Sequence, residues 1–349
     1  MAAQSTTDNL QKSIALMPRL EGLGGPSSFQ AKLIQGLQKK GILAHYDVYD
    51  PQVKSILVVG GTKHLSTIWQ ARKKGIRIVQ RLNGMNWIHR KKKTGIKHYI
   101  RSEYGNWILA TIRKRLTDSI IYQSQFARSW WQTTYGSSKV NSTVIYNGVD
   151  LDTYQPEDFD QYPTDHIRIL LVEGHLGQGN ESGLQNAIQL VQHLAPRFSQ
   201  PIELVVAGKV PNEIKETISQ LNDLWITWAG IVPRTEIPAL DRSAHLLFSA
   251  DLNAACPNSV IEALACGLPV VAYATGSLPE ILQNDAGRTA PYGANYWELE
   301  NPDANALADS ATEILNNLRH FKTSARKQAE LMFGLDKMVD EYLKILLPN

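Results

Sequence analysis

Short apolar runs alternate with longer segments of helical spacing along most of the chain. Runs rich in β-branched residues are typical of buried strands, and in the first half they are residues 13–18, 55–59, 76–82, 119–122 and 144–146. In the second half they are residues 167–173, 202–207, 225–228, 245–249 and 269–272. Strands that alternate with helices in this way are typical of parallel sheets covered by helices.

Helical spacing is clearest after the first predicted strand. Phe29, Leu33 and Leu37 recur every four residues, which predicts a helix over residues 28–40 that ends at Gly41. The same reasoning predicts further helices over residues 183–194, 304–316, 324–333 and 337–347.

Residues 151–164 interrupt the alternation. They contain two prolines and several acidic residues without apolar periodicity, so we predict a linker there. Two alternating halves joined by one linker predict an α/β protein of two Rossmann-like, doubly wound domains that face each other across a cleft. Ligands in such sheets bind beyond the carboxyl ends of the strands, so the cleft is the expected site.

The composition is that of an ordinary folded protein. The 349 residues suit two domains, and 43% of them are hydrophobic. No apolar run reaches the roughly 18–20 residues that span a bilayer, and residues 1–12 are polar, so neither a membrane span nor a secretory signal is expected. Two cysteines, Cys256 and Cys266, cannot form a disulfide framework. We therefore expect a cytoplasmic protein.

The net charge of +3 conceals a strong asymmetry. Residues 1–150 carry 23 Lys and Arg against 7 Asp and Glu, whereas residues 151–349 carry 13 against 26. Such a split indicates a basic surface that meets an anionic partner, such as a membrane, a nucleic acid or a charged substrate. The alternative is an uneven distribution of solvated side chains.

Two segments have the chemistry of a phosphate site. Gly24 and Gly25 lie between the first strand and the first helix, where glycine lets backbone N–H groups approach an oxyanion, although tight-turn glycines are an equally good explanation. Residues 257–271 form an apolar helix followed by a Pro-Val-Val strand. The amides of Asn258, Ser259 and Val260 would face a phosphate at the start of that helix.

Glu262 lies one turn into the same helix. A carboxylate there can accept hydrogen bonds from two ribose hydroxyls. Its alternative role is to compensate the helix dipole, which favours acidic residues in the first turn.

The stretch Pro257–Val271 resembles the signature of retaining nucleotide-sugar glycosyltransferases of family 4, which have the GT-B fold. Gly24–Gly25 resembles the phosphate loop of their first domain. Residues 121–124 and 144–150 resemble the end of that domain, and residues 275–281 resemble the segment after the signature helix. The similarity spans most of the chain.

The resemblance implies a metal-independent transfer of a sugar, with retention, from a nucleotide diphosphate sugar to a hydroxyl of a glycan or lipid-linked acceptor. An acceptor domain, residues 1–152 plus a C-terminal crossover helix at 335–349, would face a donor domain, residues 153–334. Glu262 matches the family's ribose-binding glutamate. The nucleotide sugar would be a co-substrate with no further cofactor, and the leaving phosphate would accept the proton of the acceptor.

The sequence departs from the family pattern at the donor site. Ala254 stands eight residues before Glu262, where the family has a second acidic residue. His175 occupies the place of an arginine, and a neutral or acidic residue, near Asn180, that of a lysine. The loss of two phosphate cations weakens the stabilisation of the leaving group.

Other residues are candidates to replace these cations. Lys209 and Arg234 each follow a predicted strand of the second domain, and His175 itself is expected to assist in holding the diphosphate. We expect Glu262, which holds the ribose, and His175 to be the catalytic residues. The departures also leave an alternative function, a catalytically degenerate glycosyltransferase-like protein that binds a sugar or nucleotide.

Fewer sequence features indicate which residues bind the acceptor. Asn83, Asn86 and Trp87 follow a first-domain strand and are candidates to hydrogen-bond and stack on a sugar, unless Asn83 begins a β-turn and Trp87 lies in the core.

The basic charge of the first half is concentrated in residues 89–101 and 113–115. Trp107, Ile108 and Ile112 lie among these charges, as on a helix at a lipid interface. We therefore expect contact with an anionic membrane surface. The same charges would suit a nucleic acid, but no recognition motif accompanies them, so no nucleic-acid partner is expected.

Overall fold

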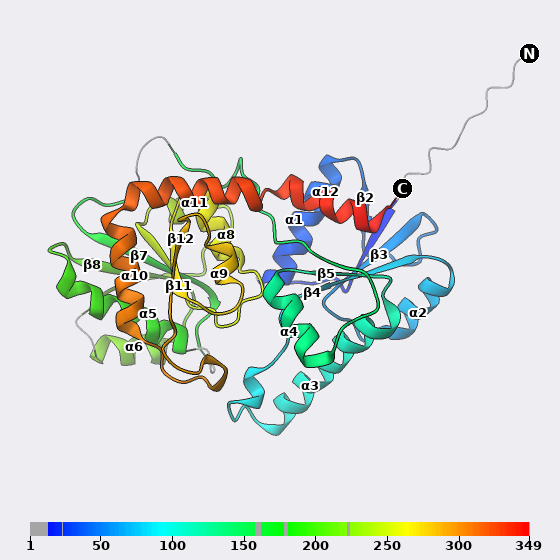
Figure 1. The fold of residues 1–349 in the computed structure, drawn as a ribbon, viewed down its shortest axis with the longest axis horizontal. Coiled ribbons are helices and arrows are strands. Elements are labelled where there is room, and N and C mark those ends of the chain that lie inside the picture. The colour runs from blue at the N-terminus through cyan, green and yellow to red at the C-terminus, as the bar shows by residue number, and fades with distance from the viewer. Residues whose placement is uncertain (1–12, 23, 158–161, 178–180, 222–223, 349) are drawn as a thin grey trace, which may run out of the picture.

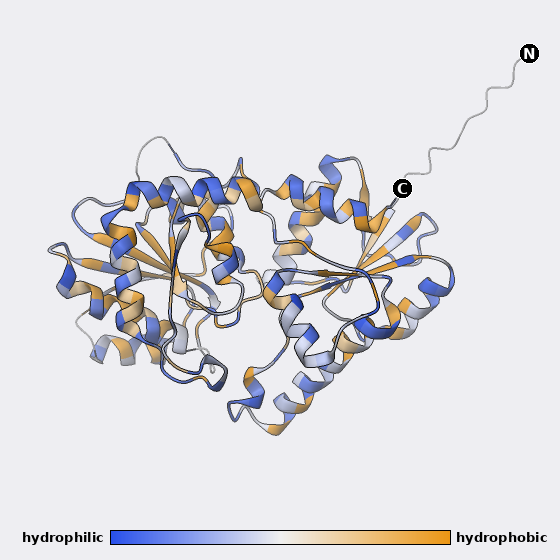
Figure 2. Cartoon of the chain, in the orientation of Figure 1, coloured by the Kyte–Doolittle hydropathy of each residue, from blue (hydrophilic) through white to orange (hydrophobic). Residues whose placement is uncertain are grey.

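The computed structural model describes residues 13–22, 24–157, 162–177, 181–221 and 224–348. The chain forms two lobes that stand side by side, each a six-stranded parallel sheet flanked by helices (Figure 1). Hydrophobic residues concentrate in the strands at the centre of each lobe, and hydrophilic residues dominate the outer faces of the helices (Figure 2). This is the predicted α/β architecture of two doubly wound domains.

The first sheet has the strand order β2-β1-β3-β4-β5-β6. Its strands are β1 (Ser13–Met17), β2 (Leu43–His45), β3 (Val53–Val59), β4 (Arg77–Leu82), β5 (Ser119–Tyr122) and β6 (Ser142–Val144). Its helices are α1 (Gly25–Lys39), α2 (Leu65–Lys73), α3 (Ile96–Thr111) and α4 (Gln125–Tyr135), with short helical turns η1 (Ile88–Arg90) and η2 (Ile112–Leu116). The direction of strand addition reverses at β1, and such a point is where doubly wound sheets bind ligands.

The second sheet has the order β12-β11-β10-β7-β8-β9 and reverses at β7. Its strands are β7 (Ile167–His175), β8 (Ile202–Lys209), β9 (Trp225–Gly230), β10 (Leu246–Ser249), β11 (Val270–Tyr273) and β12 (Gly287–Ala290). Its helices are α5 (Ser182–Leu194), α6 (Asn212–Leu221), α7 (Ile237–Arg242), α8 (Asn258–Ala265), α9 (Leu278–Ile281), α10 (Ala304–Asn316) and α11 (Leu318–Met332), with η3 (Ala195–Arg197) and η4 (Tyr296–Glu298).

The chain finally returns to the first lobe. Helix α12 (Leu335–Leu346) continues beyond α11 along the upper edge of the first lobe in Figure 1 and packs against α1. Tyr342 and Phe29 are in contact, with ring centroids 5.3 Å apart. Gly36 allows the close approach, because a Cβ atom there would lie 2.4 Å from Val339 Cγ2.

Some boundaries differ from the sequence-based prediction. The edge strands β2 and β12 are not predicted, because they lack runs of β-branched residues and become strands by pairing with a neighbour. Strand β6 ends at Val144, where the sequence predicts a strand to begin. None of the helices within the described residues is long and apolar enough to cross a bilayer.

Candidate active site

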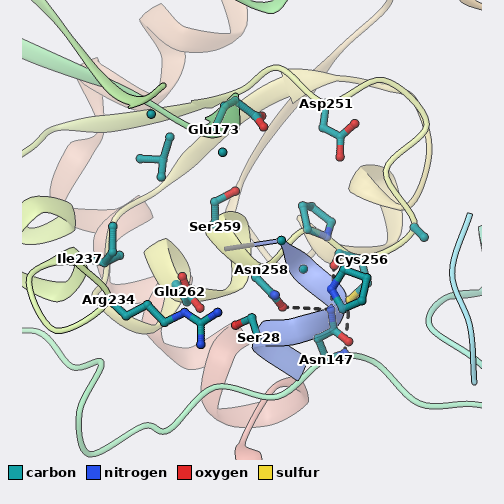
Figure 3. Close-up of a pocket in the computed structure, with 18 of the residues that line it drawn as sticks. Ser28, Asn147, Glu173, Arg234, Ile237, Asp251, Cys256, Asn258, Ser259 and Glu262 are labelled. Atoms are coloured by element: carbon teal, nitrogen blue, oxygen red, sulfur yellow. Dashed lines mark hydrogen bonds between the residues drawn. The ribbon is translucent and has the colours of Figure 1, made fainter. Parts of the chain in front are cut away.

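A cavity of about 370 Å³ lies between the two lobes. Its walls come from the carboxyl ends of β4 and β7 and from loops that follow β1, β5, β9 and β10, together with the start of α8. Figure 3 shows side chains from both lobes around this space. The cavity therefore lies where both sheets reverse their strand order, as expected for a ligand site.

Helix α8 places its first residues on the cavity wall. Asn258 and Ser259 line the cavity, whereas the side chain of Val260 is buried in the core of the second lobe. The first lobe holds this helix end, because Asn147 Nδ2 donates to Asn258 Oδ1 at 3.0 Å and to the carbonyl of Cys256 at 2.9 Å. The first N–H groups of a helix have no partner within it and attract anions.

A second helix begins on the opposite wall. Gly24 is the N-cap of α1 and Gly25 its first residue, and both line the cavity. A Cβ atom on Gly25 would lie 3.9 Å from Asn258 Nδ2, so the two helix starts approach each other closely. Two positive helix ends at one cavity favour a ligand with concentrated negative charge.

Glu262 lines the same cavity from one turn inside α8. Its Oε1 accepts a hydrogen bond of 2.7 Å from Lys32 Nζ, and the two side chains are only 13% and 15% exposed. Lys32 belongs to α1, so this ion pair joins the two lobes. Burial, and secondarily the charge of Glu262, raises the pKa of Asp241 well above its usual value.

The proposed donor-site cations have different positions. Arg234 lines the cavity from the loop after β9 (Figure 3). His175 and Lys209 pair with each other in the register of β7 and β8, and neither belongs to the cavity lining. Asn180 lies outside the described residues. The donor-binding roles predicted for these residues stay predictions.

Two carboxyl groups that are not predicted from the sequence also line the cavity. Glu173 is near the end of β7 and Asp251 follows β10, which is the neighbouring strand. Figure 3 shows the two side chains on the same side of the cavity. Burial, and secondarily the charge of Asp251, raises the pKa of Glu173 to about 8. The carboxyl of Glu173 is therefore mostly neutral at pH 7.

The predicted acceptor residues are not all at the cavity, since Asn86 and Trp87 are not among its lining residues. Asn83 lines the cavity, and its carbonyl accepts a hydrogen bond of 2.7 Å from Trp131 Nε1. The backbone N–H and C=O of Asn86 both bond to the side chain of Asn106 on α3. Trp87 packs edge-to-face against Trp297 of the second lobe, with ring centroids 5.2 Å apart.

Sequence reasoning missed four charged residues at the site, namely Lys32, Arg81, Glu173 and Asp251. Lys32 pairs with Glu262, and the other three line the cavity. Arg81 and Glu173 each lie near the carboxyl end of a strand at or close to a reversal point, and that position is the signal that points to them.

Two family models match the chain. The model described as Glycosyltransferase Family 4 matches residues 56–153, and the model described as Glycosyl transferases group 1 matches residues 167–317. The two matched regions lie in the first and second lobes, respectively.

Curated relatives match over part of their length. One subunit of the phosphatidylinositol N-acetylglucosaminyltransferase of Arabidopsis thaliana is 26% identical over 153 residues, which are 43% of this chain and 33% of the relative. GDP-mannose-dependent alpha-(1-6)-phosphatidylinositol dimannoside mannosyltransferase of Mycobacterium tuberculosis is 26% identical over 221 residues, 61% of this chain and 54% of the relative. The chain thus spans a third to about half of these relatives.

Solved structures share the fold over nearly the whole chain. Sucrose-phosphate synthase from Thermosynechococcus elongatus superposes with a TM-score of 0.74 at 16% identity, covering 96% of this chain and 98% of that one. Anabaena HepE in complex with UDP-glucose superposes with a TM-score of 0.68 at 16% identity, covering 96% and 99%.

Proposed function

Because the chain belongs to the glycosyltransferases of family 4 type with the GT-B fold, we propose that it transfers a sugar from a nucleotide diphosphate sugar to an acceptor hydroxyl, with retention. The observation that carries the proposal is one cavity bounded by Glu262 and by the N-termini of α1 and α8. This arrangement supplies acceptors for a ribose and donors for a diphosphate.

The proposed donor lies along α8. Glu262 accepts hydrogen bonds from the ribose hydroxyls, and the amides of Asn258 and Ser259 meet the diphosphate. Arg234 adds positive charge from the loop after β9. These groups stabilise the charge that develops on the leaving diphosphate, so the chemistry depends on positioning and electrostatics.

The proposed reaction uses no bound metal and no protein nucleophile. The acceptor hydroxyl attacks the anomeric carbon as the bond to the diphosphate breaks, and the departing phosphate oxygen takes the proton of that hydroxyl. Helix N-termini and Arg234 would carry the charge that a metal ion carries elsewhere. Activity is therefore expected to persist in excess EDTA, and its loss there would contradict this part of the proposal.

The acceptor is proposed to be lipid-linked or presented at an anionic membrane surface. Five apolar or aromatic residues on α3 are 45–78% exposed, and Ile96, Ile100, Tyr104 and Trp107 recur along one face. Exposed basic residues of the same segment include Lys97 and Arg101 on α3 and Lys93 just before it. The relatives from Arabidopsis and Mycobacterium have names that contain phosphatidylinositol.

One part of the predicted lipid-facing surface is wrong. Ile108 and Ile112 are 5% and 0% exposed and pack in the core of the first lobe. They occupy the inner face of α3 and the turn after it, because the hydrophobic core needs one apolar face of this helix. The outer face retains Trp107, which is 53% exposed.

The second candidate function is a degenerate protein of the same fold that binds but does not transfer. Ala254 replaces the second acidic residue, and the cavity that must accept a diphosphate is lined by two carboxyl groups, Glu173 and Asp251. Donor hydrolysis or transfer by the wild-type protein would exclude this function.

Calorimetry with UDP, GDP and their common sugar conjugates tests the proposal. We expect one diphosphate to bind the wild-type protein, and Glu262→Gln to weaken it by roughly tenfold because the ribose loses a charged acceptor. Transfer or hydrolysis of the matching sugar nucleotide should fall in parallel. If no nucleoside diphosphate binds, the proposed function is wrong.

A further inference from the structure

The floor of the cavity holds a buried arginine. Arg81 lies near the end of β4 in the first lobe, is 1% exposed and lines the cavity. Its Nη2 donates to Asn147 Oδ1 at 2.7 Å, and its guanidinium carbon lies 3.7 Å from the centre of the Phe29 ring. Nε and Nη1 have no hydrogen-bond partner among the residues that the structure describes.

No described group balances this charge. The described ion pairs do not include Arg81, and the titratable groups that face it are Tyr342 and Cys256. Burial raises the pKa of Cys256 to about 12 and that of Tyr342 further, so both are neutral at pH 7. A buried charge without a partner costs stability, and such groups occur where a ligand supplies the opposite charge.

Arg81 is also linked to both helix starts. Its partner Asn147 bonds to Asn258, the first residue of α8, and Gly25 at the start of α1 lies against the same Asn258 side chain. The guanidinium is thus connected through Asn147 to the place where the two helix starts approach each other. Strand β7 of the second lobe supplies no positive charge for an anion at this place, because Glu173 and Gly174 line the cavity there.

We propose that Arg81 supplies, beside Arg234, a second positive charge for the donor diphosphate, in place of the cations that the sequence lacks at His175 and near Asn180. This inference rests on the proposed function. Arg81 is a positioning residue, because it orients Asn147 and through it Asn258, and it lowers the energy of an anion between the two helix starts. The first lobe thereby takes part in binding the donor.

The test uses three variants of the full chain. Arg81→Met removes the charge, and Arg81→Lys keeps it without the planar hydrogen-bonding group. Arg77→Met is the matched control, because Arg77 starts the same strand and points to the same side of the sheet. Arg77 bonds to the carbonyl of Ile345 at 2.6 Å and to Ser119 Oγ at 2.7 Å, and does not line the cavity.

Calorimetry with inorganic pyrophosphate measures the anion site directly. We expect Arg81→Met to raise the Kd by about tenfold or more, since charge-assisted bonding is lost. Arg81→Lys should recover part of this affinity, and Arg77→Met should stay within about twofold of the wild type. In thermal unfolding, Arg77→Met should lower the Tm more than Arg81→Met. Arg77→Met removes two hydrogen bonds, whereas Arg81→Met removes one and also removes a fully buried charge.

The outcomes separate this inference from the proposed function. Equal pyrophosphate affinity in the wild type and Arg81→Met overturns the role of Arg81, even if nucleotides bind. Arg81→Lys binding no better than Arg81→Met also overturns it. Pyrophosphate binding that depends on Arg81, without binding of any nucleoside diphosphate, supports the anion site and overturns the proposed donor. If Arg81→Met does not fold, the Arg81→Lys comparison decides.

Discussion

Lys32 and Glu262 form an ion pair that crosses from one lobe to the other inside the candidate site. The pair is mostly buried, so removing the lysine leaves a carboxylate with little solvent and without its partner. We expect Lys32→Met to lower the free energy of unfolding by about 2 kcal/mol. It should also raise the KM for the donor more than it lowers kcat, because Glu262 loses its orientation.

Lys39 is the control on the same helix. It pairs with Asp150 at 3.4 Å, but its side chain is 51% exposed, and exposed pairs contribute about 0–1 kcal/mol. Lys39→Met should therefore change neither stability nor KM by much. Equal effects of the two substitutions, in urea unfolding and steady-state kinetics, would show that the Lys32 pair has no special role.

The raised pKa of Glu173 predicts how donor affinity depends on pH. Below about pH 8 the carboxyl is mostly neutral, and above it a negative charge enters the cavity that must bind the diphosphate. Affinity for UDP or GDP should therefore fall as the pH rises from 7 to 9. Glu173→Gln should abolish the fall, and Asp251→Asn should shift its midpoint to lower pH, because Asp251 contributes to the raised pKa.

The raised pKa of Glu173 also makes the free energy of unfolding depend on pH. A carboxyl that ionises less readily in the folded protein stabilises the fold at low pH. This contribution declines from the ordinary pKa of glutamate up to about pH 8. Chemical unfolding at pH 5 and pH 8 should show a smaller pH dependence for Glu173→Gln than for the wild type. An unchanged profile in both experiments would mean that the cavity does not hold this carboxyl in its neutral form.

At the scale of elements, the contact of α1 with α12 depends on Gly36. Replacing a helical glycine by alanine usually stabilises by about 1 kcal/mol, but here the new Cβ would overlap Val339. We expect Gly36→Ala to lower the free energy of unfolding by about 2 kcal/mol, as overpacked core substitutions do. Adding Val339→Ala should recover part of the loss, which a double-mutant cycle in urea measures.

Gly105 of α3 is the matched control. A Cβ atom there would contact Asn86 Nδ2 at 3.5 Å, an ordinary distance. Gly105→Ala should therefore leave stability unchanged or raise it. A stabilising Gly36→Ala would show that α12 moves away from α1 at little cost.

The outer face of α3 predicts binding to anionic vesicles. Ile100 and Trp107 are 62% and 53% exposed, and replacing both by serine should lower co-sedimentation with phosphatidylglycerol vesicles severalfold. Trp225→Ser is the control, because Trp225 is 47% exposed on β9 of the acidic second lobe. Equal binding by all variants, or equal binding to neutral vesicles, would count against this surface.

At the scale of the whole molecule, further contacts besides the Lys32 pair hold the lobes together. Glu280 of α9 accepts hydrogen bonds from the N–H groups of Gln125 and Phe126 at the start of α4. Lys91 pairs with Glu298, and Trp297 packs between Trp87 and Trp130, with centroids 5.2 and 5.3 Å away. The lobes are thus closed on each other at the cavity and beside it.

We expect a substitution of Trp297 to weaken the contact between the two lobes. Trp297→Ala removes the aromatic contacts from the second lobe and leaves each sheet intact. The radius of gyration by X-ray scattering should increase, and kcat should fall by about tenfold because the two halves of the site separate. Tyr49→Ala, on an exposed side chain of the first lobe, should change neither quantity.

Much of the fold is predictable from local pattern. The β-branched runs identify ten of the twelve strands within the described residues, because buried parallel strands need apolar side chains on both faces. Glu262 and the start of α8 are likewise predictable, since the helix start, the glutamate and the strand that follows lie within one short segment. These features depend on residues that are close together along the chain, so local pattern is enough to predict them.

The set of side chains that line the cavity follows from long-range packing. Arg81, Glu173 and Asp251 lie at the ends of different strands, and Lys32 lies in the middle of a helix, so no spacing along the chain indicates that they share one site. The order of the strands and the docking of the lobes bring them together. The same holds for Ile108 and Ile112, which the sequence assigns to a lipid-facing surface and the packing of α3 buries. The role of a charged or apolar side chain depends on the groups that it contacts. In this protein those contacts are set by long-range packing.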